Sequence, residues 1–364
     1  MTTCDSPVRV AGLGVYLPDK VETARDIASK TGIPQNVIAD KMGLHHKHRA
    51  GPAEHVTAMA AKAAHKALAD AHVAAGDIDL LIYFGSEYKE FPVWSAAAHI
   101  QRLVGAYRAW AYEIYALCGG GIVAFKTARD HLLADPAIHR ILMVAATREA
   151  DLVDYGNARS RFLFNIADGA AAAVLERAGD GENAARDGRD HRVLASALET
   201  DGRFSLDVLV PVGGSFLPPT PGWAPDAAAV AVLAAAGLPA GVRVAHKLDV
   251  PDQEGMRARL DPVSFEHFVS VIDRALAASG VARSDVRFLA ATHMKRSIHQ
   301  KLLDTLQLSW EQTYYLENEG HVQAADQIIA LMAGEKLGRL HPGDVAVLAA
   351  AGLGYTWGAT VIRW

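Results

Sequence analysis

The chain has 364 residues, 51% of them hydrophobic and 21% charged, with a formal net charge of −5 at pH 7. This length allows one large core or two packed domains, and the negative charge argues against general nucleic-acid binding, which needs a basic surface. No apolar run reaches the roughly 18 residues of a membrane-spanning helix, residues 1–20 lack a secretory-signal pattern, and the two cysteines, Cys4 and Cys118, form no disulfide framework or zinc cluster. We therefore expect a cytoplasmic protein with a subunit interface, binding neither membrane nor nucleic acid.

Strand and helix patterns alternate along the first half of the chain. Runs rich in β-branched residues and bounded by turn residues predict strands, whereas alanine-rich periods predict helices. We expect strands at Val8–Leu17, Asp77–Phe84, Arg140–Ala146 and Asp168–Leu175, and helices within Glu22–Lys41, at Glu54–Ala71 and Trp94–Leu103, and from Cys118 to about Leu133. The polar stretch Met42–Arg49 holds several histidines but no carboxylate or cysteine ligands, so we expect a solvated loop and no metal site.

The second half follows Arg177–Arg192, a segment rich in Gly, Asp, Glu and Arg that we expect to be an exposed connection. A strand at Val193–Thr200 and a helix at Asp261–Ser279 come next. An internal repeat then becomes visible, because Ala67–Gly85 and Ala275–His293 both read as helix, short turn, aspartate and buried strand.

A second pair of segments repeats in the same order. Arg140–Ala146 followed by Asp168–Leu175 corresponds to Asp344–Ala350 followed by Gly354–Ile362. We therefore predict two similar α/β halves, 1–185 and 186–364, packed as one layered body. Strand ends from the two halves can then meet and build one site.

Cys118 is the candidate nucleophile of the first half. It follows a strand pattern that ends at Leu117 and precedes Gly119, Gly120, Gly121 and a helix-like run. The positive end of a helix favours the thiolate, which is the nucleophilic form of cysteine, and glycines leave the sulfur open to a reactant. A buried structural cysteine at a tight turn is the alternative.

Two histidines stand at strand-to-helix transitions in the second half. His293 ends the strand FLAATH, and His321 lies within ENEGHVQAADQ. A histidine can exchange protons near neutral pH or donate an N–H to a developing negative charge. The glycine-rich stretch Ala349–Trp357 could supply main-chain donors for an oxyanion hole.

Four motifs in this order resemble the thiolase-superfamily condensing enzymes, closest to β-ketoacyl-ACP synthase III. They are AYEIYALCGGGIVAF, NIADGAAAAVLE, ATHMKRSIHQ and GLGYTWGATVIRW, spread over essentially the whole chain. The resemblance implies a five-layered αβαβα fold, a homodimer and ping-pong acyl transfer. It makes Cys118 the acylated residue, His293 the first catalytic histidine and the main chain at Leu353 part of the oxyanion hole, where the family usually has glycine.

The third catalytic position departs from that family, which has asparagine in a G-N-x-S pattern. This chain has Gly320-His321-Val322-Gln323. A Cys-His-His set resembles the elongating ketoacyl synthases, in which two N–H donors can stabilise an enolate. Alternatively, Asp326 could orient a histidine, and a Cys-His-Asp set would suit acyl transfer to an alcohol or amine. His321 as a packing replacement is the third possibility.

Glu87, within FGSEYKEFPVWS, is a second departure. It resembles in position the general-base glutamate of hydroxymethylglutaryl-CoA synthases, and we expect it to point toward the region of His293. A surface glutamate in a polar loop is the alternative. The neighbouring Phe91, Pro92 and Trp94 fit a substrate tunnel or a dimer interface.

Cationic residues near the tunnel mouth are candidates for binding a thioester carrier, whose phosphates they would attract. Lys41 falls where the family has an arginine near the CoA adenine, although the tryptophan expected before it is Val37. The other candidates are Arg159 and Arg161, which flank the family position at Ser160, and Lys295 and Arg296, which follow His293. Each is also explicable as an ordinary surface charge.

The sequence thus predicts an acyltransferase that uses acyl-CoA or acyl-ACP thioesters and no tightly bound cofactor. Decarboxylative Claisen condensation with a malonyl-thioester is the leading hypothesis. Acyl transfer to oxygen or nitrogen is the alternative, and hydroxymethylglutaryl-type condensation is third. A non-catalytic partner subunit is disfavoured, since such subunits tend to lose the nucleophile and this chain keeps Cys118 and His293.

Overall fold

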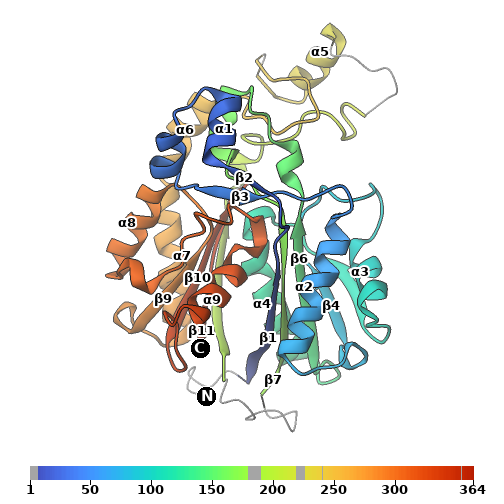
Figure 1. Ribbon diagram of the computed structural model, residues 1–364, viewed down its shortest axis with the longest axis vertical. Helices are drawn as coiled ribbons and strands as arrows, with labels where there is room; N and C mark the ends of the chain where they lie inside the picture. Colours follow the sequence, from blue (N-terminus) through green and yellow to red (C-terminus); the bar gives the residue numbers. More distant parts are fainter. Residues whose placement is uncertain (1–6, 179–189, 219–225, 240, 354) are drawn as a thin grey trace.

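A mixed β-sheet organises the chain in the computed structural model, which describes residues 7–178, 190–218, 226–239, 241–353 and 355–364 (Figure 1). Its strand order is β5-β4-β6-β7-β1-β8-β11-β10-β9. The strands of this sheet are β1 Val8–Tyr16, β4 Leu80–Tyr83, β5 Trp110–Glu113, β6 Arg140–Thr147, β7 Gly169–Arg177, β8 Arg192–Thr200, β9 Val286–Ala291, β10 Val345–Gly352 and β11 Thr356–Arg363. A separate short ribbon pairs β2 Val21–Thr23 with β3 His46–His48.

Helices cover and divide this sheet. They are α1 Ala24–Thr31, α2 Val56–Asp70, α3 Ala96–Val104, α4 Gly120–Ala134, α5 Ala227–Ala235, α6 Gln253–Leu260, α7 Ser264–Ser279, α8 Arg296–Leu306 and α9 Asp326–Lys336. None of the helices within the described ranges is long and apolar enough to cross a membrane.

Apart from β5 at one end, the strand order is symmetric about the point where β1 meets β8 through Arg9 and Arg192. Outward from β1 lie β7 and β6, each antiparallel to the strand before it, and then β4, parallel to β6. Outward from β8 lie β11 and β10 with the same antiparallel relations, and then β9, parallel to β10. This order is what two similar halves would produce, and the division at 185/186 stays a prediction.

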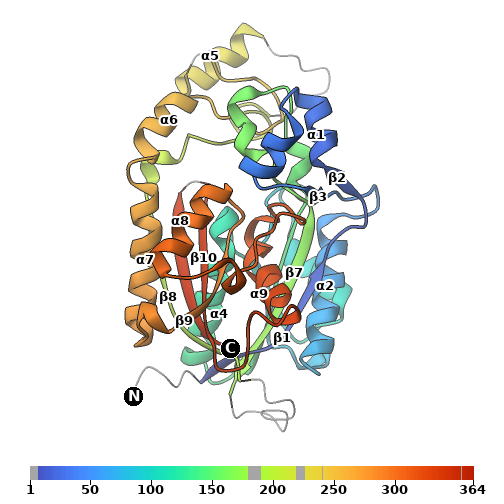
Figure 2. The ribbon, with the colours of Figure 1, turned by 60° about the vertical axis from the view of Figure 1, so that its left-hand side comes forward.

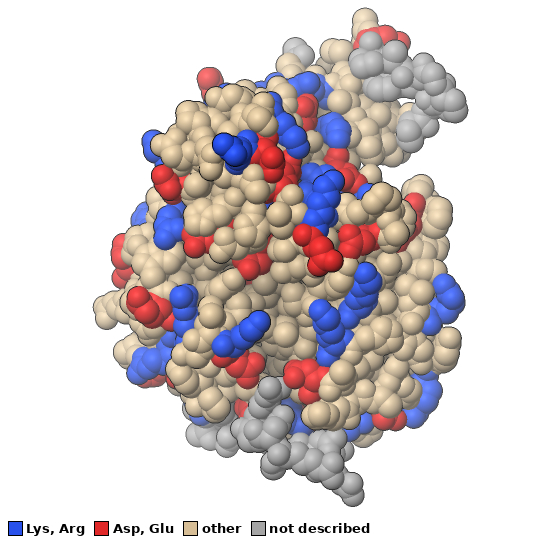
Figure 3. Space-filling model, viewed as in Figure 1, with Lys and Arg blue, Asp and Glu red and all other residues tan. Residues whose placement is uncertain are grey.

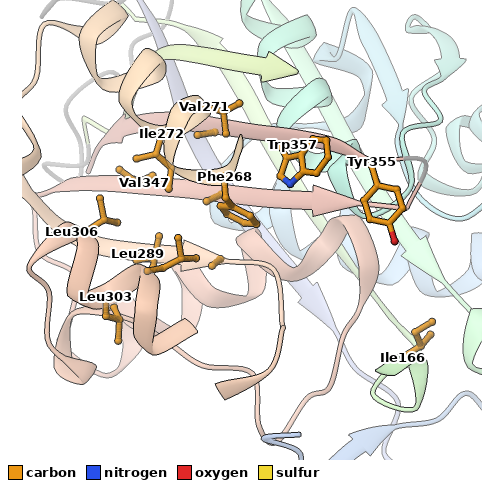
Figure 4. Packing of buried hydrophobic residues seen from close by; sticks show 14 of the residues in the cluster. Ile166, Phe268, Val271, Ile272, Leu289, Leu303, Leu306, Val347, Tyr355 and Trp357 are labelled. Atoms are coloured by element: carbon orange, nitrogen blue, oxygen red, sulfur yellow. The ribbon is translucent and has the colours of Figure 1, made fainter. Parts of the chain in front are cut away.

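Three helix layers alternate with the two halves of the sheet. Helices α2 and α3 cover one outer face, α7 and α8 cover the opposite face, and α4 and α9 lie between (Figures 1 and 2). Each layer has its own apolar cluster. In the α7 layer, Phe268, Val271 and Ile272 pack against strand residues that include Trp357 (Figure 4). The predicted αβαβα arrangement is confirmed.

The predicted helices and strands lie within a few residues of the observed ones, with two differences. The strand before Cys118 ends at Glu113, four positions before the predicted end at Leu117. The stretch Met42–Arg49 was expected to be a solvated loop, and this is wrong. Its centre forms β3, where Lys47 is fully buried and donates to the main-chain oxygens of Phe164 and Ile166, each at 2.7 Å. Most of the predicted connection Arg177–Arg192 lies outside the described residues.

Candidate active site

Cys118 lies in a single helical turn, Leu117–Gly119, directly before α4, and it is 4% exposed. Leu117 has a φ of 49°, a left-handed conformation that costs energy in a residue with a Cβ atom. The backbone therefore turns sharply at the nucleophile. Cys4, the other cysteine, lies outside the described residues.

The glycines around this turn permit close packing of main chains. A Cβ atom on Gly120 would lie 2.9 Å from the oxygen of Phe84, and one on Gly121 would lie 2.6 Å from the oxygen of Ala324. A Cβ on Gly352, at the end of β10, would lie 3.3 Å from the main-chain nitrogen of Cys118. These glycines let three segments converge on the nucleophile. Their expected role of leaving the sulfur open to a reactant stays a prediction.

His321 joins Cys118 to Asp326. Its Nε2 lies 3.0 Å from the sulfur of Cys118, and its Nδ1 lies 2.6 Å from Oδ2 of Asp326. Asp326 is fully buried and also accepts the main-chain N–H groups of Val322 and His293, at 2.7 and 2.8 Å. Because a carboxylate can only accept here, Nδ1 of His321 carries the proton and Nε2 faces the sulfur.

Asp326 and Cys118 both favour the charged form of His321. Burial opposes protonation, but Asp326 and Cys118 outweigh it and raise the pKa of His321 well above its ordinary value. An imidazolium beside the sulfur favours the thiolate. The arrangement has the geometry of a Cys-His-Asp triad.

His293 is held differently. Its Nδ1 lies 2.8 Å from the side-chain nitrogen of Asn165, and its Nε2 lies 3.0 Å from the oxygen of Gly43. Since the amide nitrogen donates, Nδ1 accepts and Nε2 carries the proton. Burial lowers the pKa of His293 to about 4, so this histidine is neutral at pH 7. It lines the same cavity as Cys118.

An apolar cavity of about 290 Å³ opens beside Cys118. His293, His321 and the predicted oxyanion-hole residue Leu353 are among the residues that line it. Most of the rest of its wall is hydrophobic, including Met42, Phe162, Leu163, Ile166, Phe268 and Met294. A cavity of this kind suits an acyl chain attached to the sulfur. Phe268 and Tyr355 reach it from α7 and the β10–β11 turn (Figure 4).

Two residues near the sulfur were not predicted from the sequence, and one of them, Gln323, also lines the cavity. Oε1 of Gln323 is 2.7 Å from the sulfur of Cys118, and Nε2 of Gln323 is 2.6 Å from Oε2 of Glu149. Glu149, which follows β6, is 8% exposed. Gln323 stands two positions after His321, which was a signal that it lies near the site, but nothing in the sequence pairs it with Glu149.

Glu87 is exposed in the loop between β4 and α3, and it is not one of the residues that line the cavity beside Cys118. Its role as a general base stays a prediction. Trp94 is partly buried in the same loop and packs edge-on against Phe91, at 5.4 Å between ring centroids. The structure therefore brings together Cys118, His293, His321, Asp326 and Leu353, and leaves these two residues outside the group.

Three of the predicted carrier-binding residues share one cavity. Lys41, Lys295 and Arg296 line a second cavity of about 640 Å³ together with Trp310. Arg296 also pairs with Glu317 at 2.8 Å and lies over the Trp310 ring at 4.6 Å. Met42 and Lys295 line both this cavity and the one beside Cys118, so the two adjoin.

The other two candidates lie apart from that group. Arg159 forms an ion pair with Asp249, at 2.9 Å, and donates to the oxygen of Gly241, whereas Arg161 is exposed. On the face seen in Figure 3, cationic and anionic side chains are interspersed. In the part of the chain that the structure describes, this face therefore carries no broad cationic surface.

Comparisons with known proteins find similar enzymes. A family model described as "3-Oxoacyl-[acyl-carrier-protein (ACP)] synthase III" matches residues 112–202, and the model of the C-terminal part of that enzyme matches residues 276–364. Proteins named β-ketoacyl-ACP synthase III from Rhodospirillum centenum and Rhizobium rhizogenes are each 29% identical over 357 residues, covering 98% of this chain and 98% of the relative.

Solved structures share the fold. The 3-oxoacyl-ACP synthase III of Aquifex aeolicus VF5 aligns with a TM-score of 0.75 and 23% identity, covering 98% of this chain and 100% of that one. The priming β-ketosynthase of the R1128 polyketide pathway aligns with a TM-score of 0.79 and 20% identity, covering 98% and 96%. Together with the Cys118 turn and the converging histidines, these matches identify the chain as a β-ketoacyl-ACP synthase III-like enzyme of the thiolase fold.

Proposed function

We propose that this chain transfers an acyl group from a thioester to the sulfur of Cys118 and then condenses it with a malonyl-thioester, with loss of carbon dioxide. The observation that supports this most directly is the 3.0 Å approach of His321 Nε2 to the Cys118 sulfur, with Asp326 behind the imidazole. The names of the relatives, which are condensing enzymes, support the same reaction.

In the first half-reaction the thiolate of Cys118 attacks the thioester carbonyl. The new sulfur–carbon bond forms, the carrier thiolate leaves, and the imidazolium of His321 can give it a proton. Asp326 keeps the imidazole oriented, since it holds Nδ1 at 2.6 Å. Main-chain N–H groups near Cys118 and Leu353 are the proposed donors to the tetrahedral oxyanion.

In the second half-reaction the malonyl carboxylate leaves as carbon dioxide, and its bonding electrons form an enolate. The enolate carbon attacks the acyl carbonyl, a carbon–carbon bond forms, and Cys118 departs as thiolate. Once the carrier thiol has left, Nε2 of His321 takes a proton from solvent, and its N–H can then donate to the enolate oxygen, since Nε2 lies 3.0 Å from the sulfur and His321 lines the cavity. His293 lines the same cavity and is the second proposed donor.

Acyl transfer to an alcohol or amine is the second candidate, and one observation favours it. The N–H of His293 is directed at the oxygen of Gly43, so an enolate would have to compete for it. A Cys-His-Asp triad, by contrast, is complete as it stands and could deprotonate an acceptor hydroxyl or amine. Hydroxymethylglutaryl-type condensation has less support, because Glu87 is exposed.

The covalent mechanism is tested by incubating the chain with acyl-CoA or acyl-ACP and measuring intact mass. One acyl adduct is expected, and it should be absent from Cys118→Ala and present in Cys4→Ser. An unmodified mass with every donor would contradict the proposal. Release of labelled carbon dioxide from malonyl-thioester then separates the two candidates, since transfer to oxygen or nitrogen releases none.

We further propose a homodimer that uses acyl-CoA or acyl-ACP donors bound near Lys41, Lys295 and Arg296. The cavity that these residues line adjoins the one beside Cys118, which supports their role at the entrance. Large hydrophobic side chains exposed around β5 support the dimer, among them Phe91 at 60% and Val93 at 107% exposed. A cytoplasmic location stays a prediction.

A further inference from the structure

A buried chain of hydrogen bonds runs from Cys118 away from His321. The Cys118 sulfur lies 2.7 Å from Gln323 Oε1, Gln323 Nε2 lies 2.6 Å from Glu149 Oε2, and Glu149 Oε1 lies 2.7 Å from the Ser86 hydroxyl. Cys118, Gln323 and Ser86 are 4% exposed and Glu149 is 8% exposed. The catalytic steps described above use none of the last three residues.

The Gln323 backbone is held in an unfavourable conformation at this point. Its φ is 55°, in the left-handed region that residues with a Cβ atom rarely adopt. Such a conformation is unfavourable and persists only where surrounding contacts fix it. Here it directs the amide into the space between the sulfur and Glu149.

The two ends of an amide have opposite hydrogen-bonding character. An ionised Glu149 can only accept, so it holds the NH₂ end of Gln323 and leaves the carbonyl end facing Cys118. A carbonyl oxygen accepts from a thiol S–H but repels a thiolate. A neutral carboxyl or amide in place of the carboxylate could donate to the Gln323 oxygen, and the NH₂ end could then turn toward the sulfur.

We propose that Glu149, acting through Gln323, is a positioning residue that sets how much of Cys118 is thiolate. The ionised carboxylate favours the thiol, and His321 on the other side favours the thiolate. This inference depends on the proposed function only in taking Cys118 as the nucleophile. A more stable thiolate is a weaker nucleophile, which slows the acylation of Cys118. It is also a better leaving group, which speeds the departure of Cys118 in the second half-reaction.

Other charged groups near these hydrogen bonds do not take the place of the contact between Gln323 and Cys118. Burial has the largest influence on Glu149 and raises the pKa of its carboxyl above the ordinary value. The charge of His321 lowers this pKa, and the charges of Glu87 and Asp168 raise it. Tyr355 is the further titratable group that interacts with Cys118 on the cavity side. Of these groups, His321 alone has a hydrogen bond to the sulfur among the described residues.

The test is the pH dependence of Cys118 alkylation by iodoacetamide, in which the thiolate displaces iodide. The full chain carries Cys4→Ser, and modification is measured by intact mass. Glu149→Gln is isosteric and keeps partners for Ser86 and Gln323. We expect its alkylation rate below the midpoint of the titration to rise about five- to tenfold, with the midpoint moving to lower pH. An unchanged midpoint, or one moved to higher pH, would overturn the inference.

Two further variants test whether Glu149 acts on Cys118 through the side-chain amide of Gln323. In a Gln323→Met background, Glu149→Gln should change the rate less than twofold; an undiminished change would show that charge acts through space and would overturn the role of Gln323. Glu90→Gln is the matched control, because Glu90 Oε1 bonds the hydroxyl of Thr57. It should leave the midpoint in place, and a shift as large as that of Glu149→Gln would contradict the inference. The readout needs no acyl donor, so it stands or falls separately from the proposed reaction.

Discussion

The side-chain nitrogen of Asn165 lies 2.8 Å from Nδ1 of His293, and this contact decides which nitrogen of the imidazole carries the proton. The main-chain oxygen of Asn165 also accepts the N–H of His321 at 2.8 Å. The carbonyl groups on either side of Asn165 are held by the buried amine of Lys47. Both histidines therefore depend on one support that comes from the first half of the chain.

Replacing Asn165 with leucine should damage the second half-reaction more than the first. The change removes the donor to His293 Nδ1 and frees the imidazole to adopt the other tautomer, while the main-chain bond to His321 remains. Loss of a buried hydrogen bond costs about 1–3 kcal/mol, so turnover should fall roughly five- to a hundredfold. The rate of Cys118 acylation, followed by intact mass, should change less than threefold. An equal fall in both rates would contradict the assignment of His293 to the second step.

Asp326→Asn should slow acylation of Cys118. Without the carboxylate, His321 loses the partner that most strongly favours its charged form, and removing the aspartate of a comparable triad lowers rates by about 10⁴-fold. We expect a fall of at least a hundredfold at pH 7, measured as the rate of adduct formation. Asp273→Asn, which removes an exposed carboxylate paired with Arg283, is the control and should stay within threefold. If Asp326→Asn unfolds at the same temperature as the parent chain but acylates normally, the triad interpretation is wrong.

Cys118, His293, His321 and Asp326 could be singled out from the sequence because strand ends and helix starts are readable from local patterns. Their convergence followed from the internal repeat, which predicts that equivalent strands of the two halves end near each other. Asn165, Gln323 and Glu149 could not be found in this way. Their partners lie 128 to 205 positions away in the chain, and such contacts depend on side-chain directions that local patterns do not contain.

The stretch around Lys47 was predicted to be solvated, but Lys47 itself is buried. Its composition is that of a solvated loop, and lysine is rarely buried unless it is paired. The partners that make burial tolerable are the oxygens of Phe164 and Ile166 and, at 3.6 Å, the carboxylate of Glu22. All of these come from other parts of the chain, so polarity alone predicted the wrong environment.

Protein stability should fall as the pH drops from about 6.5 toward 4. Burial lowers the pKa of His293 to about 4 and that of His299 to about 3, whereas the ordinary value is near 6.5. The unfolded chain therefore binds these protons first, and stability that is complete above pH 6.5 is lost below it. Each histidine can contribute about 1.4 kcal/mol per pH unit in this window.

His299→Phe should reduce the loss of protein stability at low pH. Thr313 would lose its contact with His299 Nε2 but keep its bond to the oxygen of Leu289, at 2.7 Å, so no buried hydroxyl is left unpaired. Between pH 7 and pH 5 the variant should lose about 2 kcal/mol less than the parent chain in urea unfolding. His65→Gln, at an exposed position on α2, should behave like the parent. Identical pH dependence in His299→Phe and the parent would show that His299 is not titrating in this range.

Lys295→Glu should weaken binding of the acyl donor without changing the chemical step. Lys295 is exposed at the cavity that it shares with Lys41 and Arg296, and carriers present phosphates or acidic side chains to such a site. An exposed charge contributes up to about 1 kcal/mol, so KM should rise about fivefold while kcat stays within twofold. Added salt should reduce the difference. Lys126→Glu, on α4 with a side chain that is 45% exposed, is the control, and an equal rise in its KM would contradict a specific site.

The exposed edge of the sheet at β5 should be the dimer interface. β5 is the terminal strand in the order of the sheet, and an unprotected edge strand invites pairing with another chain. Trp110 on this strand is 51% exposed, and Phe91 and Val93 in the loop before α3 are 60% and 107% exposed. Such a group of large hydrophobic side chains is typical of a surface that a partner covers.

Charge placed in that surface should therefore produce monomers. We expect the parent chain to have about twice the 38.8 kDa mass of one subunit in light scattering, and Phe91→Glu/Val93→Glu to have the mass of one. Phe216→Glu, at another exposed hydrophobic position, should remain dimeric. Leu117, which precedes the nucleophile, is another large hydrophobic residue and is 36% exposed. We expect the partner to cover it and hold the Cys118 turn, so separation of the subunits should also slow acylation of Cys118. A parent chain that is already monomeric at micromolar concentration, yet acylates at full rate, would show that the site is complete without a second copy.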